Sequence, residues 1–212
     1  MKIIQNSIFL LLFTSFSILA QENDFQSWYS ISFKKKVVKK TDVILKTGLR
    51  LRENSSLYSK NFVDLRLKRV LSKRFAFASG YRYIINRDDR LEISNLHRFY
   101  ADILYKNKLA KRLRYSVRNR LQIQGNIDYN TTFRQKFLLT YNIRKTKVTP
   151  NIATEYFFRN EDGINKLRST ISLAYPINKD IDFDLAYRIQ KDFYINNPEN
   201  LYILEVKISY NL

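Results

Sequence analysis

The single histidine, His97, is the side chain best suited to act as a base near neutral pH. A serine nucleophile needs such a base within hydrogen-bond reach, and Ser94 is the nearest serine before it. In an extended strand these two positions face opposite sides, and the neighbouring residues contain no His-x-Ser arrangement. Lipid hydrolysis stays an alternative, but the prediction is that this protein is not an enzyme.

Two pairs of carboxylates could perform acid–base chemistry, namely Asp182 with Asp184 and Asp88 with Asp89. The first pair has the spacing of one face of a strand, where ion pairing is the simpler role, and the second lies in a polar connection. The chain has no Cys, no cluster of metal-ligand residues and no glycine-rich nucleotide motif. We therefore predict no cofactor and no metal.

Arginine is the residue type whose spacing is most informative. Planar guanidinium groups bind carboxylates and phosphates through paired hydrogen bonds. The candidate binding residues recur at alternate positions: Arg50, Arg52, Arg66, Arg82, Arg98, Arg114, Arg118, Arg120, Arg134, Arg168 and Arg188. Fewer acidic residues share this face, so we expect a network of ion pairs with an excess of positive charge.

Extended strands must position these arginines. In residues 112–124, apolar residues such as Leu113 and Val117 alternate with polar ones such as Arg114 and Arg118, which is the period of a strand. The same pattern predicts eleven strands, at about 25–33, 43–52, 62–70, 75–85, 93–105, 112–124, 133–143, 148–159, 167–175, 181–193 and 201–212.

The strands are longer than is usual in globular sheets, and one face of nearly every strand carries full charges. From residue 21 onward, the sequence has no apolar run long enough for a membrane helix. Membrane spanning would therefore require strands closed into a barrel. The predicted fold is all-β: a closed antiparallel transmembrane β-barrel of about 10–12 strands, with the arginines in its lumen.

The first residues have the pattern of a secretory signal peptide. Lys2 precedes an apolar stretch that ends at Ala20, and polar residues follow at once. We predict that residues 1–20 are cleaved and that residues 21–212 form an outer-membrane β-barrel. The formal net charge of +19 would favour a nucleic acid partner inside a cell, but export argues against one.

The connections fall into two alternating classes. Short lysine-bearing turns include Lys39-Lys40, Lys73 and Lys111, and the longer connections between them are richer in Asn and Asp. We predict that the lysine turns are periplasmic. Two bands of outward aromatic residues are expected, one near the lysine turns (Phe33, Phe75, Tyr105, Tyr115, Tyr141, Tyr175, Phe183 and Tyr210) and one near the longer connections (Tyr83, Phe133, Tyr156, Phe158, Phe193 and Tyr202).

Two further features agree with a bacterial outer-membrane protein. The last strand has an apolar face through Tyr210 to the terminus, which resembles the C-terminal signal that the barrel-assembly machinery recognises. The start Asp24-Phe25-Gln26-Ser27-Trp28, with Gly80-Tyr81-Arg82-Tyr83 and His97-Arg98, resembles a Bacteroidetes family of uncharacterised outer-membrane proteins with a domain of unknown function. This resemblance implies a barrel in outer-membrane lipid but no activity.

The number of strands raises a question, because single-chain bacterial barrels normally contain an even number. If both ends of the mature chain lie in the periplasm, the ten strands from about residue 43 onward close by themselves. The segment from Trp28 to Phe33 would then be additional, in the lumen or along the wall.

The preferred function is a narrow pore or binding barrel for small anionic solutes. Three alternatives stay open. The interior could be plugged by salt bridges, the barrel could be an outer-membrane lipid hydrolase, or the chain could be a secreted soluble β-sandwich or lipocalin-like binding protein.

Overall fold

The chain forms long strands throughout the part that the structure describes. A computed structural model describes residues 23–88, 90–159, 163–193 and 200–212. The expected signal peptide, residues 1–20, lies outside these ranges. Among the described residues, no helix is long and apolar enough to cross a membrane. The strands are β1 (Asn23–Val38), β2 (Thr41–Arg52), β3 (Leu57–Val70), β4 (Phe75–Arg87), β5 (Ile93–Lys108), β6 (Leu113–Gly125), β7 (Tyr129–Tyr141), β8 (Thr149–Arg159), β9 (Gly163–Pro176), β10 (Ile181–Asp192) and β11 (Asn200–Asn211).

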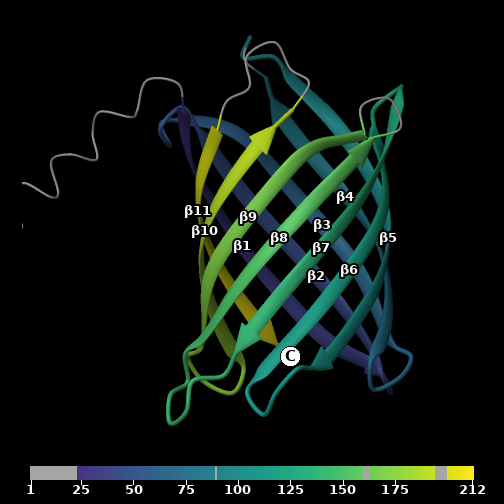
Figure 1. The fold of residues 1–212 in the computed structure, drawn as a ribbon. Helices are drawn as coiled ribbons and strands as arrows, with labels where there is room; N and C mark the ends of the chain where they lie inside the picture. Colours follow the sequence, from purple (N-terminus) through teal and green to yellow (C-terminus); the bar gives the residue numbers. More distant parts are fainter. Residues whose placement is uncertain (1–22, 89, 160–162, 194–199) are drawn as a thin grey trace, which may run out of the picture.

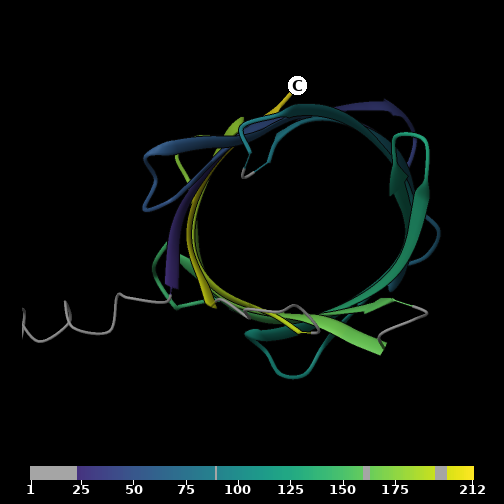
Figure 2. The same cartoon turned by 90° about the horizontal axis from the view of Figure 1, so that it is seen from above.

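These strands close into one barrel (Figures 1 and 2). Each strand pairs with its neighbours in sequence, and β1 pairs with β11 to complete the ring. Every pairing in the described ranges is antiparallel except that of β1 with β11, which is parallel. The predicted closed barrel of about 10–12 strands is confirmed, with one parallel pair that the sequence did not indicate.

The condition for a ring of ten strands is not met, because β1 begins at one end of the barrel and β11 finishes at the other (Figure 1). β1 is not additional to a ring of ten strands; it is part of the wall, with Trp28 opposite Arg50 of β2 on one side and Glu205 of β11 on the other. Strands that alternate in direction bring the first and last strands of an odd-numbered ring together in parallel. β1 thereby satisfies the backbone groups that β2 and β11 would otherwise leave at two open edges.

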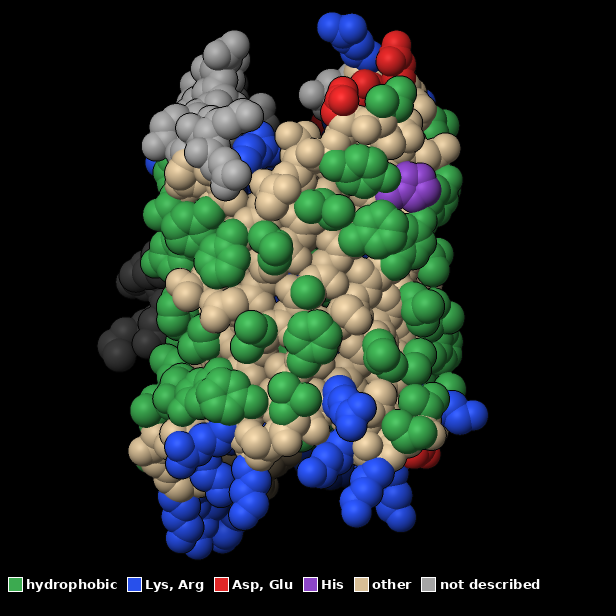
Figure 3. All heavy atoms as spheres, turned by 90° about the vertical axis from the view of Figure 1, so that its right-hand side faces the viewer, with side chains coloured by type: hydrophobic (Ala, Val, Ile, Leu, Met, Phe, Trp, Pro, Cys, Tyr) green, Lys and Arg blue, Asp and Glu red, His purple; other side chains and the backbone are tan. Residues whose placement is uncertain are grey.

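Alternation gives the wall two chemically opposite faces. Within β5, Ile103 is 57% exposed on the outside, whereas the adjacent Asp102 is 0% exposed on the inside. Apolar side chains cover the outer surface between the two ends, as Figure 3 shows on one face. A two-sheet sandwich is excluded by the closed ladder, and a lipocalin-like protein would carry its apolar face inside.

The two ends of the barrel differ. The lysine turns and the end of β11 lie at one end, where basic side chains gather in Figure 3, whereas β1 begins at the other end (Figure 1). Outward aromatic rings contact one another across neighbouring strands near both ends. Phe33 stacks on Tyr210 with a centroid distance of 5.4 Å near the lysine turns, and Phe133 lies 5.8 Å from Phe158 near the opposite end.

Two glycines allow large rings to lie against the inner wall. A Cβ atom at Gly48 would stand 2.5 Å from Cζ of Phe62, and one at Gly80 would stand 2.4 Å from the hydroxyl oxygen of Tyr100. Phe62 and Tyr100 are the cross-strand partners of these glycines and are almost fully buried. Glycine at these positions therefore lets two aromatic side chains line the lumen.

Candidate functional site: a charged lumen

The lumen contains a cavity of about 650 Å³ whose wall is strongly basic. Among the described residues, twelve Lys and Arg side chains line it, against five Asp and Glu side chains. The basic set is Lys34, Lys46, Arg50, Arg66, Arg82, Arg118, Arg120, Arg134, Lys136, Arg168, Arg188 and Lys207; the acidic set is Asp64, Glu155, Asp182, Asp184 and Glu205. Strand alternation from every side of the barrel brings these charges together.

Asp64 on β3 holds the first cluster. Its carboxylate accepts a hydrogen bond from Nε of Arg82 at 2.7 Å and one from the hydroxyl of Tyr100 at 2.8 Å. Arg82 and Tyr100 come from β4 and β5, so three successive strands meet at this carboxylate. The guanidinium of Arg82 also lies 4.1 Å from the centre of the Phe62 ring, which gives the cation a second favourable contact.

Asp102 on β5 is not among the side chains that line the cavity, but it binds two of the lining arginines and is fully buried, with 0% exposure. Arg120 of β6 donates two hydrogen bonds to it, at 2.6 and 2.9 Å, and Nη2 of Arg66 donates a third at 2.6 Å. The guanidinium of Arg120 lies 3.7 Å from the centre of the Tyr100 ring. A paired, charge-assisted geometry of this kind offsets the cost of removing the ions from water.

Glu155 on β8 is shared by three arginines. Its Oε1 accepts hydrogen bonds from Arg118 at 2.6 Å and from Nη2 of Arg134 at 2.8 Å, while Arg168 stands 3.7 Å from its Oε2. Lys136, the cross-strand neighbour of Glu155, makes no ion pair with a described residue. This region of the wall therefore carries more positive charge than its carboxylate can neutralise.

Glu205 on β11 is the carboxylate of a fourth cluster. It pairs closely with Arg188 of β10, and Nζ of Lys46 lies 3.9 Å from it. The Nε atoms of Arg66, Arg118 and Arg188 are buried and have no hydrogen-bond partner among the described residues. These donors are therefore left over after the internal network has formed.

Arg50 has an aromatic partner instead of an acidic one. Its guanidinium lies 3.7 Å from the centre of the Trp28 ring and 5.7 Å from that of Phe62. Arg168 and Arg188 also approach Trp28, at 5.2 and 5.8 Å. Within the described ranges no carboxylate pairs with Arg50, and its side chain lines the cavity.

Of the eleven arginines that the sequence singled out, eight line this cavity: Arg50, Arg66, Arg82, Arg118, Arg120, Arg134, Arg168 and Arg188. Three lie elsewhere. Arg98 donates to the side-chain oxygen of Gln124, Arg52 donates to the backbone oxygen of Asp88 at the end opposite the lysine turns, and Arg114 is exposed near the lysine turns. Whether any of them binds a solute stays a prediction.

Sequence reasoning missed the aromatic residues of the lumen. Trp28, Phe62, Tyr100 and Phe157 point inward, and each carries at least one arginine over its ring. The signal was available, since Phe62, Tyr100 and Phe157 share the parity of the charged residues in their strands. These rings suit an arginine-rich lumen because a guanidinium stacks favourably on an aromatic face, so an aromatic residue does not by itself mark the outer side of a strand.

His97 lies on the outer face, near the end opposite the lysine turns (Figure 3). Its Nδ1 is 2.7 Å from the hydroxyl oxygen of Tyr81. The ring centroids of Tyr81 and Tyr83 lie 6.0 and 5.5 Å from the centroid of the His97 ring. The hydroxyl of Ser94 lies 3.5 Å from the backbone oxygen of Asn86, to which it donates. The described contacts of His97 are thus those of an aromatic cluster, without a serine partner.

A closed ladder, an apolar outer face and a basic lumen together define a porin-like β-barrel. The chain belongs to the DUF2490 family of proteins of unknown function, whose model matches residues 25–201. The resemblance to an uncharacterised family is confirmed at this level, while a Bacteroidetes origin and the significance of the Asp24 to Trp28 start stay predictions.

Two solved structures share this fold. The NanC porin has a TM-score of 0.54 and 13% sequence identity, over 84% of this chain and 93% of that one. The KdgM porin, solved in complex with disordered oligogalacturonate, has a TM-score of 0.51 and 11% identity, over 80% and 91% of the two chains. No curated protein matches the sequence. These similarities concern the fold.

Proposed function

We propose that this protein is an outer-membrane pore for small anionic solutes. The observation that carries the proposal is the unequal charge of the cavity wall, with twelve basic and five acidic side chains among the described residues. An excess of fixed positive charge in a narrow lumen raises the local concentration of anions and lowers that of cations. Guanidinium groups also match carboxylates and phosphates in shape.

The outer face supports a membrane location. Large apolar side chains such as Leu65, Ile152 and Ile171 are more than half exposed, at 52%, 62% and 57%. Such a surface is unfavourable in water over this extent but suits hydrocarbon. Outer-membrane lipid and, through β11, the barrel-assembly machinery are the proposed partners, and the lysine turns are proposed to be periplasmic.

The solved structures with this fold support the same proposal. Both are porins, and one was solved with oligogalacturonate, an anionic sugar polymer. In our proposal the charges left over from the ion-pair network attract solute, whereas the paired arginines hold the wall in shape. Arg50 and Lys136 belong to the first group and Arg120 to the second.

Conductance in planar lipid bilayers tests the proposal. Under a gradient of KCl, we expect discrete steps and a reversal potential that indicates chloride preference. Lys136→Glu should reduce this preference, whereas Lys179→Glu in an exposed turn serves as the control for the same charge reversal outside the lumen. A folded protein that gives no steps would support the plugged, salt-bridged interior instead, and cation preference would contradict the proposal directly.

A further inference from the structure

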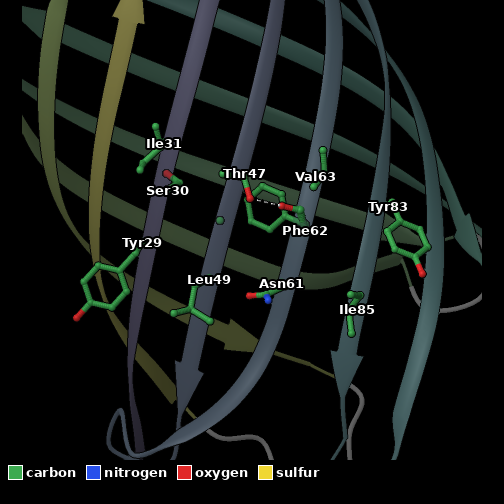
Figure 4. Close-up of a pocket in the computed structure, with 11 residues that line it drawn as sticks. Tyr29, Ser30, Ile31, Thr47, Leu49, Asn61, Phe62, Val63, Tyr83 and Ile85 are labelled. Carbon is green, nitrogen blue, oxygen red and sulfur yellow. Dashed lines mark hydrogen bonds between the residues drawn. The ribbon is translucent and has the colours of Figure 1, made fainter.

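The outer wall has three apolar grooves in the described part of the chain, of about 340, 570 and 360 Å³. Figure 4 shows the first, over Gly48, where Leu49 and Val63 lie around Thr47, whose hydroxyl donates to the backbone oxygen of Phe62. This groove and the second are lined by strand residues only. The third crosses β6, β7 and β8 and also includes Leu109, a residue of the turn between β5 and β6. It therefore reaches the end of the barrel that carries the lysine turns.

Two basic turns meet at this end of the third groove. The backbone amide of Asn142, in the β7–β8 turn, donates a 3.0 Å hydrogen bond to the backbone oxygen of Arg112, in the β5–β6 turn. The two turns and the residues next to them contribute six cations: Lys108, Lys111, Arg112, Arg144, Lys145 and Lys147. All are exposed except Arg112, which is half-buried.

These cations have no acidic residue near them in sequence. Residues 103–127 and 129–154 contain no Asp or Glu, and no ion pair forms to any of the six within the described ranges. Their positive charge is therefore not neutralised by the protein. It is available to an anionic group that lies against both turns.

The depth of the groove end matches that of a lipid headgroup. Tyr115, which lines the groove, lies 5.7 Å from Tyr105 between ring centroids, and Tyr105 lies 5.0 Å from Phe75. The hydroxyl of Tyr115 donates to that of Tyr105 at 3.4 Å. Outward aromatic rings of this kind mark the boundary between hydrocarbon and headgroups, so the two turns lie just beyond that boundary.

We propose that this groove binds an anionic phospholipid of the periplasmic leaflet. One acyl chain lies along Phe137, Leu139 and Ile152, and the phosphate lies between the β5–β6 and β7–β8 turns. The proposal depends on the barrel being in a membrane with its lysine turns on the periplasmic side, but not on solute passage. A pore without a bound lipid and a lipid-binding barrel without conductance are therefore distinguishable results.

Native mass spectrometry of the detergent-extracted barrel tests this site. The barrel is mixed with phosphatidylglycerol, phosphatidylethanolamine or lipopolysaccharide, and the retained lipid is counted. We expect phosphatidylglycerol to be retained at least about tenfold more than phosphatidylethanolamine. A variant with Lys111, Arg112, Arg144 and Lys145 changed to Gln should lose it, and a control with Lys36, Lys39, Lys40 and Lys73 changed to Gln should keep it.

A second pair of variants tests the groove itself. Ile152→Trp fills the third groove and Val63→Trp fills the first, and both side chains face outward, with 62% and 49% exposure. Ile152→Trp should displace the lipid and Val63→Trp should not, provided that both variants keep heat-modifiable migration on a denaturing gel. Equal loss in both quadruple variants, equal retention of both phospholipids, retention of lipopolysaccharide alone, or no retention by the parent would each overturn the proposal.

Discussion

The guanidinium of Arg50 lies 3.7 Å from the centre of the Trp28 ring, with the two residues directly opposite each other on β2 and β1. This contact depends on β1 being in the wall, because only that position brings Trp28 next to Arg50. It also keeps one uncompensated cation beside the cavity without a carboxylate. The position of β1 in the wall therefore determines which partner this lumen cation has.

Reversing this charge should change ion selectivity with little effect on folding. For Arg50→Glu we expect the anion-to-cation permeability ratio to fall by roughly fivefold, which corresponds to a change of about 1 kcal/mol in the free-energy difference between an anion and a cation in the solvated lumen. The measurement is the reversal potential in a salt gradient. Arg90→Glu, in the exposed β4–β5 connection, is the control. An unchanged permeability ratio in Arg50→Glu would show that Arg50 does not influence the permeating ions.

The ion pairs of Asp102 should contribute to stability. Arg120→Met removes two of the three described hydrogen bonds that Asp102 accepts. The fully buried carboxylate then has Arg66 as its remaining described partner. We expect a loss of about 3 kcal/mol in the free energy of unfolding, since a fully buried carboxylate then keeps only one of its two arginine partners. Urea unfolding in detergent, followed by heat-modifiable migration, measures it. The double variant with Asp102→Asn should be less destabilised than the sum of the two single changes.

The parallel pairing of β1 with β11 can be tested by crosslinking. The hydroxyl of Ser32 donates to that of Ser209 at 2.9 Å, and the chain has no natural Cys. The double variant Ser32→Cys, Ser209→Cys should form a disulfide under mild oxidation, because paired positions bring the two sulfurs within bonding reach. The pair Ser32→Cys, Ser172→Cys, with the second residue on β9, should not. Crosslinking of only the control pair would contradict the observed seam.

The orientation of the barrel is accessible to labelling in whole cells. Ile127, which is 88% exposed, lies in the β6–β7 connection, and Lys73 lies in a turn at the opposite end. A membrane-impermeant maleimide should label Ile127→Cys in intact cells, whereas Lys73→Cys should react only after the outer membrane is permeabilised. The reverse pattern would place the lysine turns at the cell surface and would remove the basis for a periplasmic-leaflet lipid site.

Gly80 lies directly opposite Tyr100 and leaves room for its ring against the inner wall. Gly80→Ala would bring a Cβ atom to 2.4 Å from the Tyr100 hydroxyl oxygen and 2.8 Å from the backbone oxygen of Leu65. We expect destabilisation of about 1–3 kcal/mol, because the ring must leave its place on the wall and lose its bond to Asp64. Thermal unfolding in detergent measures the effect. An unchanged midpoint would mean that the ring has another equally favourable position.

Sequence alone determined the features that depend on the period of two. Alternation fixed which side of each strand is apolar, as with Ile103 and Asp102, and the segments it predicted became the strands of a closed barrel. It also placed eight of the eleven chosen arginines in the wall of one cavity. These are local properties, since each residue faces inward or outward according to its place in its own strand.

Only the tertiary structure decided what depends on contacts between distant strands. The pairing of Asn23 with Asn200 and of Lys34 with Asn211 places β1 in the wall, and no local pattern distinguishes a wall strand from an additional one. The same holds for partners: Asp102 binds Arg66 and Arg120, whereas Arg50 stacks on Trp28. Ring closure sets which side chains meet across the lumen, because closure itself joins residues far apart in the chain.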